Sequence, residues 1–434
     1  MSTIQPLNVL LLGSGGRESA LAYKISQSPA LKKLYIAPGN GGTGQYGENL
    51  PFAATDFDAV ARAIEDKEID LVVVGPEDPL VKGLREALDA RGEGARKVAI
   101  LGPGADGARL EGSKDFAKIF MARHGIPTAA HLTVTAANIA EGEAFLKTLK
   151  APYVLKADGL AAGKGVLIEP TLESALASLR NMLAGQFGSA SAKVVIEEFL
   201  TGIECSVFVI TDGKGNYRIL PPAKDYKRAG DGDTGLNTGG MGAVCPPPFA
   251  DEAFMAKVEE RIVRPTVSGL IEDGIDYRGF IFLGLMDSDG EPLVIEYNVR
   301  MGDPETEVVM PRIASDVLPV FLHAAEGALT EADTVEADPR EAVTVMAVSG
   351  GYPGDYEKGK AITGNLQPAG SIVFHAGTRT GADGGTETSG GRVLAVTSLA
   401  PTLAQAAAQS YKALEDISFE GMRYRHDISK DVVR

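Results

Sequence analysis

Two lysines enclose a run of small residues near the middle of the chain. The segment reads Lys156-Ala-Asp-Gly-Leu-Ala-Ala-Gly-Lys-Gly165, and an apolar stretch that predicts a buried strand ends at Lys156. Phosphoryl transfer depends mainly on positioning and charge stabilisation, so two ammonium groups around a glycine-rich loop suit a triphosphate. The segment is not a GxxxxGK(S/T) phosphate loop, because glycine follows Lys164. A solvated hairpin with surface lysines is the simpler alternative.

Polar side chains alternate with apolar ones along a second segment, Val294-Ile-Glu-Tyr-Asn-Val-Arg-Met-Gly-Asp-Pro-Glu305. Because successive residues of a strand point to opposite faces, Glu296, Asn298 and Arg300 should share one face. Two oxygen donors on one face suit Mg²⁺, which binds a few side chains together with nucleotide phosphates. An arginine beside them suits an anionic substrate or an acyl phosphate. The alternative is the polar, solvent-facing side of a strand.

A third apolar segment, Val194-Val-Ile-Glu-Glu-Phe-Leu200, ends in carboxylates, and Glu204 follows it closely. Carboxylates that become buried need partners, which the amino group of a nucleotide base or the hydroxyls of a ribose would supply. The alternative is a strand end that reaches solvent.

Glycine marks two further segments. Gly13-Ser-Gly-Gly-Arg-Glu18 follows a predicted strand and opens a predicted helix, where backbone N–H groups and the helix dipole attract anions. A dinucleotide fingerprint would have glycine at position 18, so the motif indicates a phosphate turn, or else a plain tight turn. Residues 225–242 mix acids, bases and glycines with little secondary-structure signal. They are typical of a substrate-facing loop, or else of a disordered excursion.

Composition restricts the class of protein. A chain of 434 residues predicts two to four domains. The net charge of −16, without a basic stripe, argues against a nucleic-acid partner. No apolar run approaches the roughly 20 residues that span a bilayer, and the N-terminus lacks the features of a signal peptide, so we expect a cytoplasmic protein without a membrane partner. Two cysteines exclude a disulfide framework.

Apolar periodicity predicts the order of the elements. Near the N-terminus, strands alternate with helices, which predicts a parallel α/β sheet. The strands are expected at 8–13, 33–37, 69–75 and 98–101, and the helices at 17–28, 57–65 and 80–90. In the middle of the chain we expect strands at 153–157, 165–168, 193–199, 203–210, 280–286 and 293–297, with helices at 113–124, 137–150 and 172–183. After a predicted linker at 330–339, we expect strands at 342–348, 372–376 and 393–397 and a helix at 403–417.

Together these segments resemble the ATP-grasp superfamily and, within it, the glycinamide ribonucleotide synthetase family. The resemblance covers nearly the whole chain, and the order and spacing of its motifs are specific. The motifs that carry it are Gly15–Glu18, Ala37–Asn40, Val74–Glu77, Leu110–Lys114, Lys156–Gly165, Asn237–Gly242, Glu296–Glu305, Gly350–Gly354 and Phe374–Gly377.

The resemblance implies a multidomain protein of α/β and α+β type. A Rossmann-like domain with a parallel sheet would occupy 1–104. A two-lobed ATP-grasp core would follow at 105–328, with a flap lobe at about 125–192. A small, mostly β domain would occupy 329–434.

The resemblance also implies a ligase of de novo purine biosynthesis. ATP, glycine and 5-phosphoribosylamine would give glycinamide ribonucleotide, ADP and phosphate through a glycyl-phosphate intermediate. The enzyme would need Mg²⁺ or Mn²⁺ and would be a monomer or a small homo-oligomer.

The roles that the resemblance implies fall into two groups. One group would bind ATP and its metal: Lys114, Lys156, Gly163, Lys164 and Gly165 at the phosphates, Glu197 and Glu198 near adenine, Glu204 at the ribose, and Glu296 and Asn298 at the metal. The other would serve the two remaining substrates: Gly15, Gly16, Asn40 and Asn237 for binding, Gly302 and Asp303 near the acyl phosphate, and Arg300, Asp225 and Lys227 in catalysis.

Three positions depart from the family pattern. Ser19 and Tyr226 stand where the family usually has histidine, and Leu236 stands where it usually has proline. Serine cannot act as an acid or base near neutral pH as histidine can. Two alternatives therefore stay open: an ATP-grasp ligase with different substrates, and a nucleotide-binding sensor without catalysis.

Overall fold

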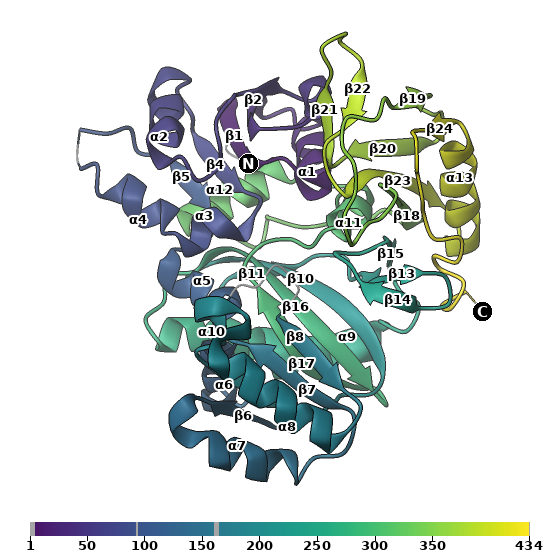
Figure 1. Cartoon of the computed structure of the whole chain (residues 1–434). Helices are drawn as coiled ribbons and strands as arrows, with labels where there is room; N and C mark the ends of the chain where they lie inside the picture. The colour runs from purple at the N-terminus through teal and green to yellow at the C-terminus, as the bar shows by residue number, and fades with distance from the viewer. Residues whose placement is uncertain (1–4, 93, 160–164, 434) are drawn as a thin grey trace.

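The computed structural model of the chain describes residues 5–92, 94–159 and 165–433. Its N-terminal part is a parallel sheet of five strands, in the order β3-β2-β1-β4-β5 (Figure 1). All of β1 is buried, which explains its continuous apolar sequence. The elements are β1 (Leu7–Gly13), α1 (Gly16–Ile25), β2 (Leu31–Pro38), β3 (Glu48–Asn49), α2 (Phe57–Asp66), β4 (Leu71–Val74), α3 (Glu77–Val81), α4 (Leu84–Asp89) and β5 (Ala99–Leu101).

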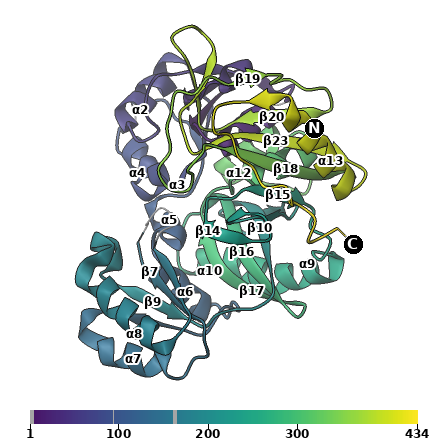
Figure 2. The same cartoon turned by 45° about the vertical axis from the view of Figure 1, so that its right-hand side comes forward.

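Two antiparallel sheets form the middle of the molecule. The first, β6-β9-β7-β8, carries α7 and α8 and projects away from the rest (Figure 2). We call residues 131–197 the flap lobe. Its elements are β6 (His131–Val134), α7 (Ile139–Leu146), β7 (Tyr153–Ala157), β8 (Val166–Glu169), α8 (Leu172–Asn181) and β9 (Val194–Glu197).

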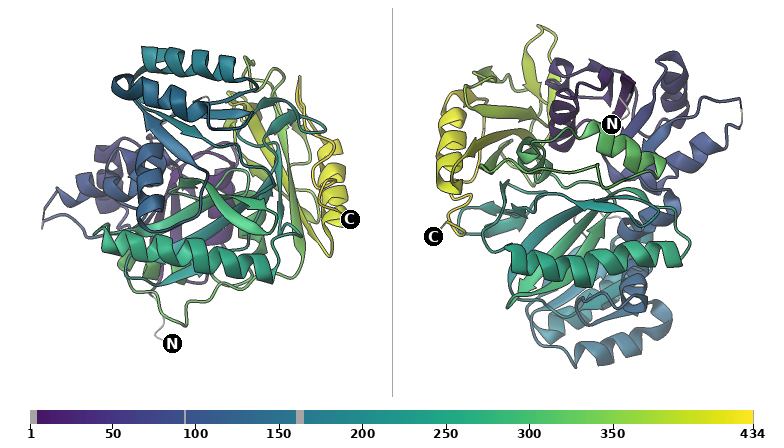
Figure 3. Two further views of the ribbon diagram at one scale, coloured as in Figure 1. Left: turned by 90° about the horizontal axis from the view of Figure 1, so that it is seen from below. Right: turned by 180° about the vertical axis from the view of Figure 1, so that it is seen from behind.

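The second sheet, β11-β10-β16-β17, is crossed on its outer side by the helical segment from α9 to α10 (Figure 3). Helices α5 and α6 connect the N-terminal part to this region and lie against β17. The elements are α5 (Ala105–Gly112), α6 (Lys114–Arg123), β10 (Ile203–Asp212), β11 (Tyr217–Ile219), α9 (Glu252–Val258), α10 (Arg264–Glu272), β16 (Arg278–Ser288) and β17 (Glu291–Asn298).

The last sheet, β12-β15-β18-β23-β20, is antiparallel and packs against α13. Its first two strands come from residues 224–245, so the chain enters this sheet long before its C-terminal segment begins. The elements are β12 (Lys224–Asp225), β13 (Arg228–Gly230), β14 (Thr234–Asn237), β15 (Gly242–Cys245), α11 (Thr306–Arg312), α12 (Leu318–Glu326), β18 (Glu341–Val348), β19 (Thr363–Gly364), β20 (Ser371–His375), β21 (Thr378–Thr380), β22 (Thr386–Thr388), β23 (Arg392–Ala400), α13 (Leu403–Glu415) and β24 (Ile417–Ser418).

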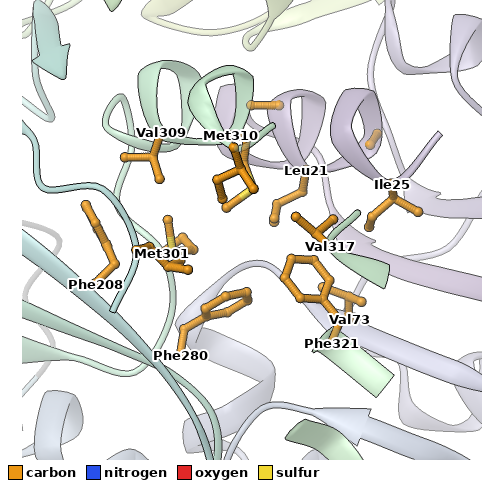
Figure 4. Packing of buried hydrophobic residues seen from close by; sticks show 14 of the residues in the cluster. Leu21, Ile25, Val73, Phe208, Phe280, Met301, Val309, Met310, Val317 and Phe321 are labelled. Carbon is orange, nitrogen blue, oxygen red and sulfur yellow. The ribbon is translucent and has the colours of Figure 1, made fainter. Parts of the chain in front are cut away.

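One hydrophobic core joins these parts. Leu21 of α1, Phe208 of β10 and Phe321 of α12 belong to the same buried cluster (Figure 4). The flap lobe has a separate cluster, built only from its own residues. No helix among the described residues is both long enough and apolar enough to cross a lipid bilayer.

The predicted fold class is confirmed, with local corrections. The predicted helix at 80–90 is wrong, because Gly83 adopts a φ of +80° and separates α3 from α4. The loop expected at 225–242 contains the hairpin β13–β14, with Gly232 and Asp233 at positive φ in its turn. Helices α9 to α12 were not predicted.

Candidate functional site

The largest set of predicted site residues surrounds one cavity between the flap lobe and β17. This cleft cavity has a volume of about 540 Å³, within the range of ligand pockets. Charged side chains from several elements line it, together with an apolar wall that includes Val166 and Ile295. The charged residues are Lys114 and Lys118 of α6, Lys156 of β7, Glu197 of β9 and Glu296 of β17.

A buried ion-pair network connects the flap lobe to α6. Lys156 Nζ lies 3.0 Å and Lys118 Nζ 3.3 Å from Glu197 Oε2. Burial would raise the pKa of Glu197, but the two ammonium groups lower it. Burial lowers the pKa of Lys118 to about 8, although Glu197 opposes this shift. The network therefore holds two cations at the edge of the cleft cavity.

The side chains predicted to share one face of β17 do line one cavity. Glu296, Asn298 and Arg300 all border the cleft cavity. A β-bulge at Ile295 precedes them, because Gly284 pairs with Glu296 whereas the next residue, Leu285, pairs with Val294. The bulge re-aims the strand end toward the cavity.

Glu296 lies among cations. Desolvation in the cleft would raise the pKa of its carboxyl, but Lys227 lowers it, as do Lys156, Arg300 and Lys114. The pKa of Lys114 is itself lowered by desolvation. The cleft therefore places Glu296 among several cations, an arrangement that suits a polyphosphate with a divalent cation.

Lys227 also faces acidic neighbours. It forms an ion pair with Glu204. Desolvation would lower the pKa of Lys227, but Asp225, Glu204 and Glu296 raise it well above the usual value. Desolvation raises the pKa of Asp225, and Lys227 opposes that shift.

Arg300 marks the boundary between the cleft cavity and a second, central cavity. Its Nη2 donates to Glu111 Oε1 at 2.7 Å and to Asn298 Oδ1 at 3.1 Å. Its Nε donates to Glu77 Oε2 at 3.3 Å. The central cavity, about 520 Å³, is lined by Arg17, Glu77, Asn237, Thr238, Gly239, Arg300, Asp303, Tyr352, Pro353 and Arg392.

A third, outer cavity of about 510 Å³ continues from the central one. The two share Asp303 and Arg392, whose charged groups lie 3.0 Å apart. Gly15 and Asn40 also line the outer cavity, as does Arg379. Three cavities therefore follow one another, with an arginine at each junction.

Three family models together match most of the chain. They describe the N domain (residues 7–111), the ATP-grasp (A) domain (112–306) and the C domain (342–431) of phosphoribosylglycinamide synthetase. The chain belongs to the phosphoribosylglycinamide synthetase family. The predicted family is confirmed, and so is the prediction of an ATP-dependent ligase.

Curated relatives and a solved structure agree with this membership. Proteins called phosphoribosylamine–glycine ligase from Vibrio cholerae and Escherichia coli K12 are each 46% identical over 430 residues, covering 97% of this chain and 97% and 98% of theirs. The crystal structure of the Thermotoga maritima phosphoribosylamine–glycine ligase matches with a TM-score of 0.84 at 37% identity, covering 97% of this chain and 100% of that one. The biotin carboxylase domain of Hydrogenobacter thermophilus 2-oxoglutarate carboxylase shares the fold, with a TM-score of 0.72 at 15% identity and coverage of 96% and 91%.

Some residues that were predicted to bind substrates or ATP in this synthetase family member do not face a cavity or are not described by the structure. Gly163 and Lys164 lie outside the described residues. The side chain of Asn40 is occupied within the protein: it donates to Ser14 O and His375 O and accepts from Gly42 N. Gly16 and Gly302 contact carboxylates instead of a cavity, since a Cβ would lie 2.2 Å from Glu307 Oε1 and 2.5 Å from Glu305 Oε2 respectively.

The other predicted residues lie at different places around the cavities. Gly165 lines the cleft cavity, whereas Glu198, at the exposed end of β9, lies beside Ala130. Glu204, Asp225 and Lys227 line none of the three cavities; Lys227 pairs with Glu204, and the charge of Glu296 affects the pKa of both Asp225 and Lys227.

Several residues of the site were not predicted from the sequence, among them Lys118, Glu111 and Arg392. Lys118 follows Lys114 by one helical turn, so the spacing along α6 could have revealed it. The carboxylate of Glu111 accepts hydrogen bonds from Arg300 Nη2 and, at 2.8 Å, from the amide of Val299. Only its place in the motif Leu110–Lys114 could have indicated this residue. Arg392 had no local signal, because its partner Asp303 is far away in sequence.

The two departures from histidine do not line the described cavities. Ser19 is buried and donates to His375 O at 2.5 Å. The hydroxyl of Tyr226 donates to Asp431 Oδ1 and accepts from Ser429 N, so this side chain faces the C-terminal segment. Both side chains act within the packing, which removes the observation that favoured a sensor without catalysis.

Proposed function

We propose that this chain joins glycine to 5-phosphoribosylamine and converts ATP to ADP and phosphate, giving glycinamide ribonucleotide in de novo purine biosynthesis. The observation that carries this proposal is the series of three cavities with an arginine at each junction. One cavity would hold ATP, the central one glycine, and the outer one the phosphoribosyl group.

The cleft cavity fits ATP with a divalent cation. Lys114 and Lys156 would bind phosphate oxygens, and the apolar wall would contact adenine. Glu296 and Asn298 would hold Mg²⁺ or Mn²⁺, because an ionised carboxylate and an amide oxygen at one strand end match the few protein ligands that Mg²⁺ takes. When bound, the cation would neutralise phosphate charge.

The first chemical step would activate glycine. Its carboxylate oxygen attacks the γ-phosphorus, the bond to the bridging oxygen breaks, and ADP leaves with the bonding pair. Arg300, at the boundary of the cleft and central cavities, would orient the carboxylate and stabilise charge on the transferred group. The product, glycyl phosphate, is a better electrophile than a free carboxylate.

The second step would form the amide. The amine nitrogen of phosphoribosylamine attacks the acyl carbon, and phosphate leaves with the bonding pair of the C–O bond. The amine gives up one proton, for which Asp225 is the proposed acceptor, because desolvation raises the pKa of its carboxyl and so strengthens it as a base. Arg392, Asp303 and the backbone at Gly15 would position the phosphoribosyl group.

The experiment is a reconstituted assay with freshly generated phosphoribosylamine. We expect ADP release that requires both glycine and the amine, and a product with the mass of glycinamide ribonucleotide. Alanine in place of glycine, and ammonia or a ribosylamine without phosphate in place of the amine, are the matched controls. Turnover with another substrate pair but not with this one would refute the proposal in favour of a different ATP-grasp ligase.

Several expectations remain untested predictions. They are the division at 1–104, 105–328 and 329–434 with a flap lobe at about 125–192, the cytoplasmic location, and the monomer or small homo-oligomer.

A further inference from the structure

Glu307 is a buried acid that the reaction as described does not use. It lies in α11 and is fully buried, and neither carboxyl oxygen accepts a hydrogen bond from any described residue. Its Oε1 lies over Gly16, at the start of α1, and Ala376 of the C-terminal segment is also close. An ionised carboxylate with so few donors would be costly here.

The carboxyl groups of Glu307 and Asp303 face the same turn at the start of α1: a Cβ on Gly16 would lie 2.2 Å from Glu307 Oε1, and a Cβ on Gly15 would lie 3.2 Å from Asp303 Oδ2. Asp303 Oδ2 accepts from the amide of Arg17 at 3.3 Å, and its Oδ1 lies 3.0 Å from Arg392 Nη2. Asp303 also lines both the central and the outer cavity. Two carboxyl groups in contact share a proton rather than carrying two charges.

The surroundings decide which group carries that proton. Burial would raise the pKa of Asp303, but Arg392 and Arg17 lower it. Burial and the nearby Asp303 raise the pKa of Glu307 well above its usual value, although Arg392 acts in the opposite direction. The proton therefore belongs on Glu307.

We propose that Glu307 is a neutral carboxylic acid that donates its O–H to Asp303 and thereby positions this carboxylate at the junction of the central and outer cavities. Glu307 is a positioning residue, enclosed away from the substrates. Its neutrality has a purpose: a second negative charge beside Asp303 would repel an acyl phosphate and a phosphorylated amine. The consequence for catalysis rests on the proposed function, whereas the protonation state does not.

Infrared spectroscopy tests the protonation state directly. The carbonyl band of a protonated carboxylic acid should be present in the protein at about pH 8.5 and should disappear in E307Q. E305Q is the matched control: burial raises the pKa of Glu305 only to about 7, so this group is mostly ionised at that pH and E305Q should leave the band in place. A spectrum of E307Q without loss of a protonated-acid band would overturn the proposal.

Kinetics tests the positioning role. We expect E307Q, whose amide can donate to Asp303, to keep kcat/KM for the amine within about threefold, and E307L, which keeps the volume without a donor, to lose about tenfold or more. KM for ATP should change little in both. Equal activity of E307L and the unmodified protein would show that Glu307 only fills space, and equal loss in E307Q and E307L would exclude donation. If the unmodified protein makes no glycinamide ribonucleotide, the proposed function fails, while the infrared result still decides the state of Glu307.

Discussion

The flap lobe and the rest of the molecule are stabilised by separate hydrophobic cores. The N-terminal sheet, the β10–β16 sheet and helices α11 and α12 share one apolar core, which we call the frame (Figure 4). The flap lobe packs on a core of its own. The described hydrogen bonds and ion pairs that join the flap lobe to its surroundings include Lys118 to Glu197, Ser113 Oγ to Asp158 Oδ1 at 2.9 Å, and Lys156 Nζ to Ile295 O at 3.3 Å.

This difference has a physical consequence for a ligase. Polar contacts can be exchanged for contacts with ligand and water at little cost, whereas separating apolar surfaces exposes them to water. The attachment of the flap lobe therefore depends less on apolar burial than the cohesion of the frame does.

The largest expected effect comes from truncating a core leucine in each region. Leu21→Ala in the frame and Leu179→Ala in the flap lobe should each cost about 2–5 kcal/mol, because both side chains are buried. Hydrogen exchange should show lost protection throughout the frame for the first variant, but only within residues 131–197 for the second. Equal loss of protection in β1 for Leu179→Ala would contradict the separation of the two cores.

A change on the frame side of the cleft should abolish activity without unfolding. Glu296→Ala should lower kcat by about a hundredfold or more, because the proposed metal ligand and a charge opposite the cations are lost. Glu291→Ala on the same strand, whose carboxylate pairs with Lys257 and Arg261, is the control and should keep full activity. Unchanged turnover of Glu296→Ala at saturating Mg²⁺ would refute the metal assignment.

The buried ion pair between Lys118 of α6 and Glu197 of the flap lobe should make the stability of the protein depend on pH. The pKa of Lys118 is lowered to about 8 by burial, so between pH 8 and its ordinary value of 10.5 the unfolded chain binds more protons than the folded one. The contribution of Lys118 to stability therefore rises with pH across this window and is least favourable below it. In Lys118→Met this rise should be missing, so the difference in melting temperature between variant and unmodified protein should become more negative from pH 8 to pH 10. A constant difference would exclude the shift.

A change on the flap side should weaken nucleotide binding and chemistry together. Lys156→Ala should raise KM for ATP and lower kcat, each by about tenfold, because a phosphate contact acts in both the ground state and the transition state. Lys193→Ala removes only a partly exposed ion pair with Asp115 and should change neither constant. An effect on KM alone would mean that Lys156 only binds.

The smallest effect is expected at the hairpin β13–β14. Arg425 is buried and holds its turn through Asp233 at 2.8 Å and the carbonyl of Arg228 at 3.1 Å. Because the hairpin leads to Asn237 in the central cavity, Arg425→Ala should lower kcat/KM by roughly threefold. Arg340→Ala, which breaks an exposed ion pair with Asp338, is the control and should leave kcat/KM unchanged. An unchanged kcat/KM in Arg425→Ala would show that the hairpin does not contribute to catalysis.

The fold was predictable wherever the pattern was local. The apolar run of β1 and the helix period of α2 appear in the structure close to their expected bounds. The helix expected at 80–90 failed because one left-handed glycine, Gly83, ends a turn that apolar spacing alone would continue. The hairpin at 228–237 could not be seen because its turn is held by Arg425, which is almost 200 residues away in the chain.

Residue order alone specified the groups that lie in one strand or one loop, such as Glu296, Asn298 and Arg300, because neighbours on one strand face must stay neighbours in space. Only packing of distant segments decided that Arg392 reaches the carbonyl of Asp303 across 89 positions and that Glu307 is sealed against α1. The reason is that burial and charge pairing depend on which surfaces meet, and local periodicity carries no information about that meeting.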